Sequence, residues 1–311
     1  MLRTLTLLAC LLLPAVAQSQ DIKALFLGDQ GAHQPQARFA ELQPPLAARG
    51  IELVYTDDVT ELTPTNLANY KALVVYANID QIEDQYAKSI LDYVADGGGF
   101  VPLHCASFCF RNQPDLVALM GAQFVRHGTG VFQAEVAEPD HPLMKDFTGY
   151  RTWDETYVHQ LHNSKDRTVL QYRVSEEGRE PWTWIRTRGK GRVFYTASGH
   201  DSRTWTNAGF QNLVERGIRW AVGDDPLKAG AYLDETPFTA PNMTAARTDV
   251  AKFDYVDVGP KIPNYTPSRQ WGTQGAPKTE MQQPLSADES IKHFSKPQGM
   301  SVRRYADERD F

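Results

Sequence analysis

The sequence is poor in cysteine, has no excess of positive charge, and has no long apolar segment after its first residues. Its 311 residues include three cysteines, and 32 lysines and arginines stand against 38 aspartates and glutamates, for a net charge of −6. The negative balance argues against a general nucleic-acid-binding protein, which needs a basic surface. Three cysteines are too few for a disulfide framework, so we expect a hydrophobic core to hold the fold together.

The first residues have the organisation of a secretory signal peptide. Arg3 supplies a positive charge, Leu5–Leu13 forms an apolar core, and Ala15–Ala17 is a small-x-small cleavage site. This apolar core is shorter than the roughly 20 residues that span a bilayer as a helix. We therefore predict a signal peptide over residues 1–17, a secreted or periplasmic mature chain, and no transmembrane segment.

Residues 22–104 alternate between short apolar runs and helical patterns. Strands that alternate with helices predict a mainly parallel sheet with helices on both faces, the α/β class. The strand-like runs are 22–29, 51–55, 70–79 and 99–104, and the helical stretches are 34–50 and 80–99.

Residues 130–200 differ, because five strand-like runs follow one another with little helix between them. We expect them to add antiparallel strands to the same sheet, before a helix over 207–224 closes the domain. After Asp224 the composition shifts, and nine of the nineteen prolines lie between Pro226 and Pro297. The expected organisation is one α/β domain over residues 22–224 and a proline-rich extended tail over 225–311. That tail is either a linker or a strap on the domain surface.

Four of the eight histidines follow strand-like runs or lie in glycine-rich turns. They are His33, His104, His127 and His200. Carboxyl ends of parallel strands meet at one edge of a sheet, so these side chains are expected to converge there. The WDETY segment, residues 153–157, adds two carboxylates. Imidazoles and a carboxylate together bind zinc or another divalent metal, or transfer protons without a metal. The sequence has no His-x-x-x-His spacing, so both hypotheses, a metal site and a metal-free acid/base site, stay open. A single histidine in a turn is more often a surface or capping residue.

Cys105 follows a buried strand directly, as the nucleophile does in class I glutamine amidotransferases. A nucleophile elbow usually has glycines around the cysteine, whereas here the neighbours are His104 and Ala106. A small buried cysteine at a strand end is the more common situation. The pattern therefore favours a structural Cys105.

Aromatic side chains are frequent near the histidine-bearing segments. Sugar rings stack their apolar C–H faces on aromatic rings, although a tryptophan is usually a core or interface residue. The composition of these segments is what a carbohydrate site requires. The aromatic residues are Trp153, Tyr157, Trp182, Trp184 and Trp205.

Six motifs follow one another along the chain: GGGFVPLHCAS, GAQFVRHGTG, PDHPLMKDF, WDETYV, PWTWIRTRGKGRVFYTASGHDSRTW and FQNLVERGIRWAVG. In this order they resemble the ThuA-like (trehalose utilisation) family, and the resemblance runs from about Ile22 to Gly223. It implies a glutamine-amidotransferase-like, flavodoxin-like α/β fold. It also implies a sugar-related role, connected with disaccharides and 3-keto sugars.

The resemblance also implies where the site lies. His104 stands at the family's strand-end histidine, Glu155 in its Asp-Glu-x-Tyr segment, and His200 in its Gly-His-Asp segment. We expect these three to be the catalytic acid/base residues or the ligands of a divalent metal such as zinc. The residues expected to contact the substrate are His33, His127, Asp154, Tyr157, Trp184, Asp201 and Trp205.

The expected function is isomerase, lyase or hydrolase chemistry on a small carbohydrate, a disaccharide or a 3-keto sugar. Two alternatives stay open. One is a non-catalytic sugar-binding or scaffolding module, and the other is an amidotransferase-type hydrolase that uses Cys105. The tail segment PLSADESIKHFSKPQGMSVRRYADERD is also similar to the first segment of periplasmic dehydrogenase-like propeller proteins. That similarity implies a fused or associated propeller as a partner.

Overall fold

The structure of the protein is a computed structural model, which describes residues 22–176, 178–230, 232, 244, 247–257 and 280–306. The chain divides into two compact units, Met1–Phe238 and Thr239–Phe311. The predicted signal peptide lies outside the described residues. No helix among the described residues is long and apolar enough to cross a membrane.

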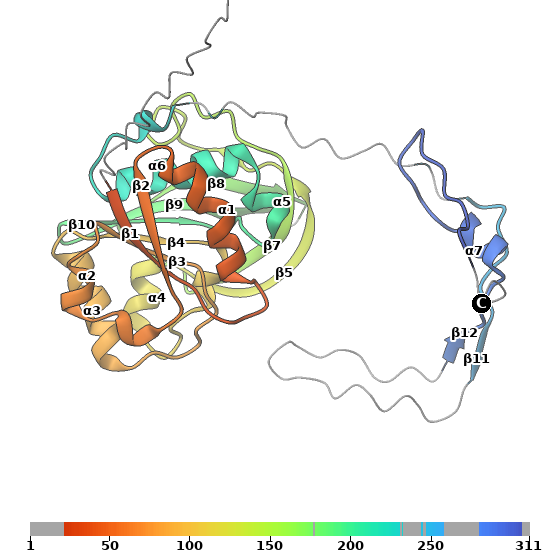
Figure 1. Ribbon diagram of the computed structural model, residues 1–311, viewed down its shortest axis with the longest axis horizontal. Coiled ribbons are helices and arrows are strands. Elements are labelled where there is room, and N and C mark those ends of the chain that lie inside the picture. The colour runs from red at the N-terminus through yellow and green to blue at the C-terminus, as the bar shows by residue number, and fades with distance from the viewer. Residues whose placement is uncertain are drawn as a thin grey trace, which may run out of the picture. The chain divides into compact units, whose positions relative to one another are not determined.

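The first unit is built on an eight-stranded sheet in the order β2-β1-β3-β4-β10-β9-β8-β6 (Figure 1). The strands from β2 to β10 pair in parallel, and β9, β8 and β6 continue the sheet in antiparallel fashion. The prediction of a mainly parallel sheet with added antiparallel strands is therefore confirmed. The strands are β1 (Ile22–Leu27), β2 (Ile51–Thr56), β3 (Ala72–Val75), β4 (Gly99–Pro102), β6 (Glu135–Val136), β8 (Arg167–Ser175), β9 (Gly178–Arg188) and β10 (Gly191–Thr196).

Helices cover both faces of this sheet, as Figure 1 shows. Side chains alternate between the two faces along each parallel strand, so Phe26 and Val74 pack on one face while Leu25 and Leu73 pack on the other. α1 (Pro35–Ala47) and α6 (Ala208–Ala221) bury their apolar residues against the first face. α3 (Asp84–Ala95) and α4 (Pro114–Met120) do so against the second. The short elements are α2 (Pro64–Leu67), α5 (Ser202–Trp205), η1 (Val59–Glu61), η2 (His104–Phe108) and η3 (Pro226–Ala229).

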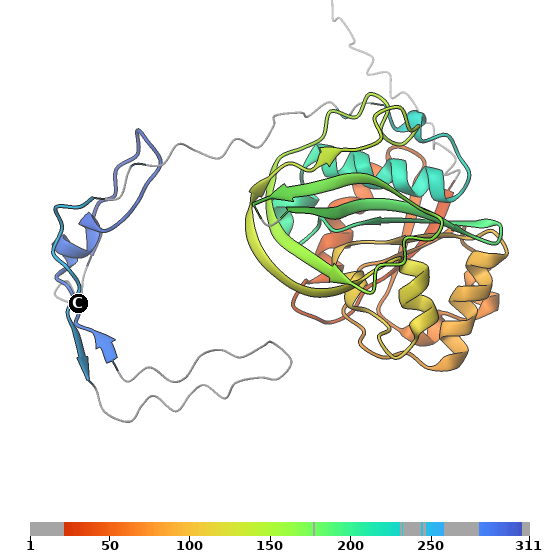
Figure 2. The same cartoon turned by 180° about the vertical axis from the view of Figure 1, so that it is seen from behind.

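The long strands β5 (Gln123–Phe132) and β7 (Thr152–Gln160) form a separate two-stranded antiparallel sheet. Figure 2 shows this ribbon curving across the end of the main sheet. The expectation that all five later runs join one sheet was wrong for these residues. The reason is packing: Tyr157 on β7 lies with Trp182, Trp184 and Tyr195 in a third apolar cluster, so β7 covers the main sheet with side chains instead of pairing with its edge.

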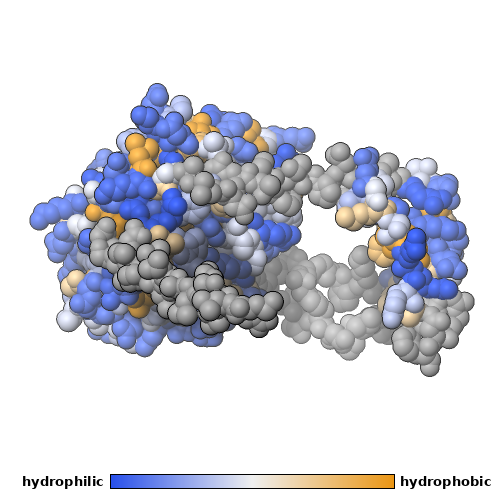
Figure 3. Space-filling model, turned by 45° about the horizontal axis from the view of Figure 1, so that its top comes forward, coloured by the Kyte–Doolittle hydropathy of each residue, from blue (hydrophilic) through white to orange (hydrophobic). Residues whose placement is uncertain are grey.

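The first unit continues beyond Asp224. η3 packs on α6, and the Tyr232 hydroxyl donates a hydrogen bond of 2.8 Å to buried Glu215. On the face drawn in Figure 3, the described residues are mostly hydrophilic, with small separate hydrophobic areas. The large apolar side chains are therefore mainly inside this unit.

In the second unit, the described residues form β11 (Tyr255–Asp257) paired antiparallel with β12 (Glu280–Gln282), and α7 (Ala287–Lys292). Its described aromatic residues are exposed: Phe253, Tyr255, Phe294 and Tyr305. Short elements thus occur where the sequence predicted an extended tail.

Candidate functional site

His104 stands where the chain leaves β4 at the carboxyl edge of the sheet. Leu103 is still extended, and His104 itself has a φ of 45°, in the left-handed region that non-glycine residues seldom adopt. The chain then turns at once into η2. The strained residue of this turn is therefore His104 and not Cys105, and the His104 side chain is completely buried.

His33 lies in the loop after β1 and approaches the same point. Its Nδ1 lies 2.7 Å from the Asn78 side-chain oxygen, which turns Nε2 inward. Asp29 folds this loop, since its carboxylate accepts hydrogen bonds from the backbone N–H groups of Gly31 and Asn78.

His200 lies in the loop after β10, and the adjacent Asp154 holds this loop in place. The buried Asp154 carboxylate accepts hydrogen bonds from the backbone N–H of Gly199 at 2.8 Å and of His200 at 3.0 Å. It also accepts from the backbone N–H of Glu155 at 2.9 Å and from the Thr204 hydroxyl at 3.0 Å. One carboxylate thus ties β7 to the His200 loop.

Glu155, on β7, faces the histidines from the opposite side. Its carboxylate oxygens lie 3.3 Å from His104 Nε2, 3.8 Å from His33 Nε2 and 3.2 Å from His200 Nδ1. The fourth predicted histidine, His127 on β5, reaches the same carboxylate with its Nε2 at 3.4 Å. The five groups come from segments far apart in the sequence and meet at the carboxyl edge, as the sequence led us to expect.

Four of these groups point one donor atom each toward a common centre. His33 Nε2, His104 Nε2, His200 Nδ1 and a Glu155 oxygen all lie within 4.8 Å of one another. These atoms are buried, and none makes a well-formed hydrogen bond within the part of the chain that the structure describes. Buried nitrogen and oxygen atoms are normally hydrogen-bonded, so these four atoms need a bound atom or group at their common centre.

The outer nitrogens fix which tautomer is present. His104 Nδ1 lies 2.6 Å from the Ala197 carbonyl oxygen, an acceptor only, so Nδ1 carries the proton and Nε2 offers a lone pair inward. His33 is held the same way by the side-chain oxygen of Asn78. This is the arrangement found around metal-binding histidines, whose second nitrogen donates to an oxygen of the protein.

Burial and mutual contact shift the pKa values within the cluster. Burial lowers the pKa of His104 and favours its neutral form. Burial alone would raise the pKa of Glu155, but the imidazoles of His104, His200 and His33 around its carboxylate outweigh burial and hold the pKa below its usual range. Burial acts to lower the pKa of His200, while Glu155 beside it has the larger combined effect and raises the pKa. The cluster thus favours an ionised carboxylate beside at least one neutral imidazole.

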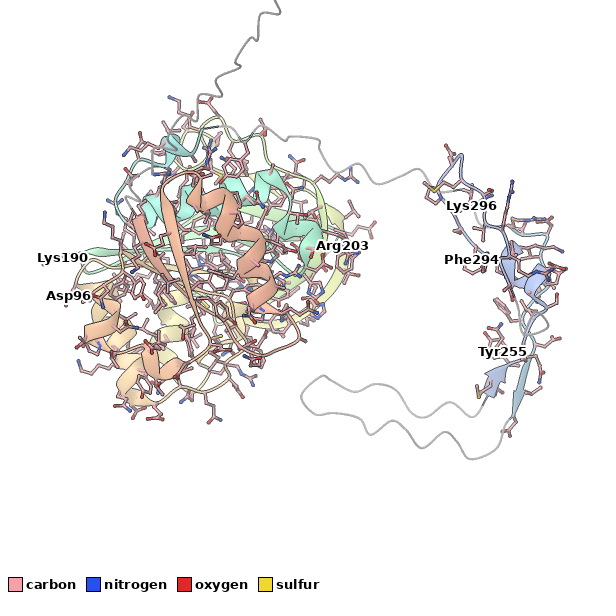
Figure 4. The ribbon with its side chains drawn as sticks, viewed as in Figure 1. Asp96, Lys190, Arg203, Tyr255, Phe294 and Lys296 are labelled. Carbon is pink, nitrogen blue, oxygen red and sulfur yellow. The ribbon has the colours of Figure 1, made fainter. Side chains whose placement is uncertain are left out.

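The more exposed side of the cluster is formed by His127 and His200, whose side chains are 39% and 30% exposed. Trp153 borders His200, with ring centroids 5.7 Å apart. The Arg203 guanidinium lies over the Trp153 ring, 3.6 Å from its centroid. Figure 4 places Arg203 at the opposite end of the first unit from Asp96 and Lys190.

The remaining predicted residues do not point a polar atom into the cluster. Tyr157 is buried and stacks on His104, with ring centroids 4.1 Å apart. Trp184 and Trp205 are fully buried, and their ring N–H groups donate to the carbonyl oxygens of Met120 and Gly199. Asp201 caps α5 by accepting from the Arg203 backbone N–H. Tyr157 therefore supports His104 and Trp205 supports the loop of His200, while Trp184 packs on Tyr195 and His159 in the core.

Cys105 is completely buried, and burial raises the pKa of its thiol well above the ordinary value. A nucleophilic cysteine needs a lowered pKa and access to substrate. Neither condition is met.

Sequence reasoning missed His159, which is not among the four histidines that the sequence singles out. His159 is buried on the same face of β7 as Glu155 and Tyr157. The spacing of two residues along a strand was the signal that could have placed it there. Asn78 and Tyr76 were also missed; the Tyr76 hydroxyl donates to the Gly199 carbonyl at 2.6 Å.

Comparison with known proteins adds a family and a fold. The profile of the ThuA family, described as trehalose utilisation, matches residues 23–221. A ThuA-like protein from Parabacteroides merdae is 22% identical with a TM-score of 0.57, covering 66% of this chain and 91% of its own. A ThuA-like protein from Bacteroides uniformis is 22% identical with a TM-score of 0.55, covering 69% and 98%. Both show a shared fold. No curated protein matches the sequence.

Proposed function

Because the chain belongs to the ThuA family, we propose that it is a carbohydrate-modifying enzyme whose active centre is a divalent metal ion bound by His33, His104, Glu155 and His200. The family points to a carbohydrate-related role. The supporting observation at the site is the set of four buried donor atoms that face one another without hydrogen bonds. The sequence predicts His104, Glu155 and His200 as ligands, and this proposal adds His33 as a fourth.

The donor set suits zinc or a neighbouring first-row ion. Three imidazole nitrogens and one carboxylate oxygen are ligands that such ions prefer. Atoms at about 2.0 to 2.2 Å from one tetrahedral ion lie roughly 3.3 to 3.6 Å apart. The distances of 3.3 and 3.8 Å from Glu155 to His104 and His33 are already close to this spacing.

The chemistry follows from the groups around the centre. A bound divalent ion supplies Lewis acidity toward a carbonyl or hydroxyl oxygen of the substrate. His127 stands outside the ligand set on the exposed side, where its imidazole can hydrogen-bond a sugar hydroxyl. Trp153 beside His200 offers an apolar ring edge for the sugar. An isomerase, lyase or hydrolase step on a disaccharide or 3-keto sugar fits these groups.

The two alternatives receive less support. A sugar-binding module would rely on exposed aromatic platforms, yet Trp184 and Trp205 are fully buried. The hydrolase based on Cys105 lacks an accessible thiolate.

We also propose that the protein is exported. The basis is the signal-peptide pattern of residues 1–17. N-terminal sequencing of the protein from its native host is expected to begin at Gln18, and an intact Met1 would contradict export. A periplasmic propeller protein, fused or associated, is the partner that the tail suggests, and co-purification from periplasmic extract tests it.

The activity is tested by incubating zinc-loaded protein with 3-keto disaccharides and with the parent disaccharides, followed by mass spectrometry of the products. Wild type is expected to convert a member of this panel, and Glu155→Gln to lose conversion. The matched control is His162→Gln, an exposed histidine outside the cluster. Binding of the sugars without conversion by wild type would favour the binding module.

A further inference from the structure

A second polar cluster lies buried behind His104, and the proposed reaction does not use it. It consists of Glu180 on β9, His159 on β7 and Tyr195 on β10. His159 and Tyr195 are buried among aromatic rings, and Tyr195 stacks on Trp184 with centroids 4.1 Å apart. Polar atoms in such surroundings cost free energy unless they are hydrogen-bonded. A phenylalanine at 195 would retain the stacking, so packing alone does not explain the hydroxyl.

These three residues form a continuous chain of hydrogen bonds. A single Glu180 oxygen lies 3.1 Å from the His159 backbone N–H and 2.8 Å from its Nδ1. His159 Nε2 lies 3.0 Å from the Tyr195 hydroxyl. A tyrosine hydroxyl has one proton, which sets the order of donors. His159 shares one proton with Glu180 at Nδ1 and donates a second from Nε2 to the Tyr195 oxygen, and the Tyr195 proton goes to the His104 carbonyl oxygen at 3.1 Å. The Ser107 hydroxyl, 3.0 Å from the Tyr195 hydroxyl, donates to the same carbonyl. The chain therefore ends on the backbone of a metal-site residue.

His104 needs such support, because its backbone is strained. A non-glycine residue in the left-handed region costs on the order of 1–2 kcal/mol and persists only where its surroundings hold it. The contacts that hold its carbonyl are the hydroxyls of Tyr195 and Ser107. The neighbouring Ala197 carbonyl holds its ring. Tyr195 and Ala197 are two residues apart, so the end of β10 fixes both the backbone and the imidazole of His104.

We propose that Glu180, His159 and Tyr195 are positioning residues that keep His104 Nε2 aimed at the metal. This inference rests on the proposed function. Glu180 orients the His159 ring, His159 fixes the Tyr195 hydroxyl, and that hydroxyl holds the strained turn at His104. Outer groups of this kind typically contribute 10- to 100-fold to metal affinity.

The test is cobalt(II) binding, followed by visible absorption at neutral pH. Tyr195→Phe is expected to weaken cobalt binding by about 10- to 100-fold and to alter the shape of the absorption band, because His104 is no longer held. The matched control is Tyr93→Phe, which removes a tyrosine hydroxyl that donates to the Tyr70 backbone carbonyl at 3.0 Å, just before β3 begins and so at the opposite end of the strands from the site. It is expected to bind cobalt as wild type does.

A second pair of variants separates positioning from general stability. His159→Leu removes both ring contacts and should weaken cobalt binding as Tyr195→Phe does. His159→Gln keeps a polar atom near the Nε2 position and should recover part of the affinity. Wild-type affinity and spectrum in both Tyr195→Phe and His159→Leu would overturn the inference. If wild type itself binds no cobalt, the proposed metal centre fails instead, and the two failures are thereby distinguished.

Discussion

Asp154→Asn tests the part of the structure that holds His200 in place. The Asp154 carboxylate accepts four hydrogen bonds, from Gly199, His200, Glu155 and Thr204. Asparagine has nearly the same shape but replaces one oxygen by an NH2 donor. The least costly orientation places that NH2 toward Thr204, whose hydroxyl can turn and accept it.

In this orientation only the Gly199 N–H loses its acceptor. A buried donor without a partner costs about 1–3 kcal/mol, so the free energy of unfolding should fall by that amount. For a domain of this size the midpoint of thermal unfolding changes by roughly 2–4 °C per kcal/mol, which gives a decrease of about 2–12 °C. Loosening the Gly199–His200 segment should also weaken zinc binding.

Urea denaturation of the metal-free proteins measures this loss. Asp201→Asn is the matched control, because it makes the same change in the same loop at a helix cap, where asparagine and aspartate are equivalent. We expect a decrease below about 1 kcal/mol for it, because the ion pair that Asp201 forms with Arg203 is partly exposed. If Asp154→Asn were as stable as Asp201→Asn, the assignment of Asp154 as the residue that holds the loop would be refuted.

Two further predictions concern the metal and the thiol. Zinc at about 100 times its Kd should raise the free energy of unfolding by about 2.7 kcal/mol, or roughly 5–11 °C in thermal melts, and chelator or Glu155→Gln should abolish the increase. Cys105→Ala should keep zinc content and turnover at wild-type levels, and loss of turnover with zinc retained would restore the thiol to the mechanism.

The fold and the meeting of the site residues were predictable from local patterns. Alternating strands and helices predict a parallel sheet, and the carboxyl ends of its strands must lie along one edge. His33, His104 and His200 each follow such a strand, so their convergence needed no knowledge of side-chain packing. Glu155 is different: its placement came from the family resemblance and not from strand order.

The sequence alone does not predict which face of a strand or helix carries a given side chain. Trp184 and Trp205 lie near the site in sequence, yet both point into the core, and proximity alone does not indicate direction. The separate β5–β7 sheet depends on packing between distant segments. The contact between Tyr195 and the His104 carbonyl likewise joins residues 91 positions apart.

X-ray absorption at the zinc K edge, on protein loaded with one equivalent of zinc, tests the metal centre most directly. We predict one zinc ion with three imidazole nitrogens and one carboxylate oxygen at about 2.0 to 2.2 Å. The histidine contribution should fall when His200 or His33 is replaced by alanine, and should not change in His162→Gln. A zinc ion surrounded by water oxygens alone, or no tightly bound zinc, would contradict the centre formed by His33, His104, Glu155 and His200.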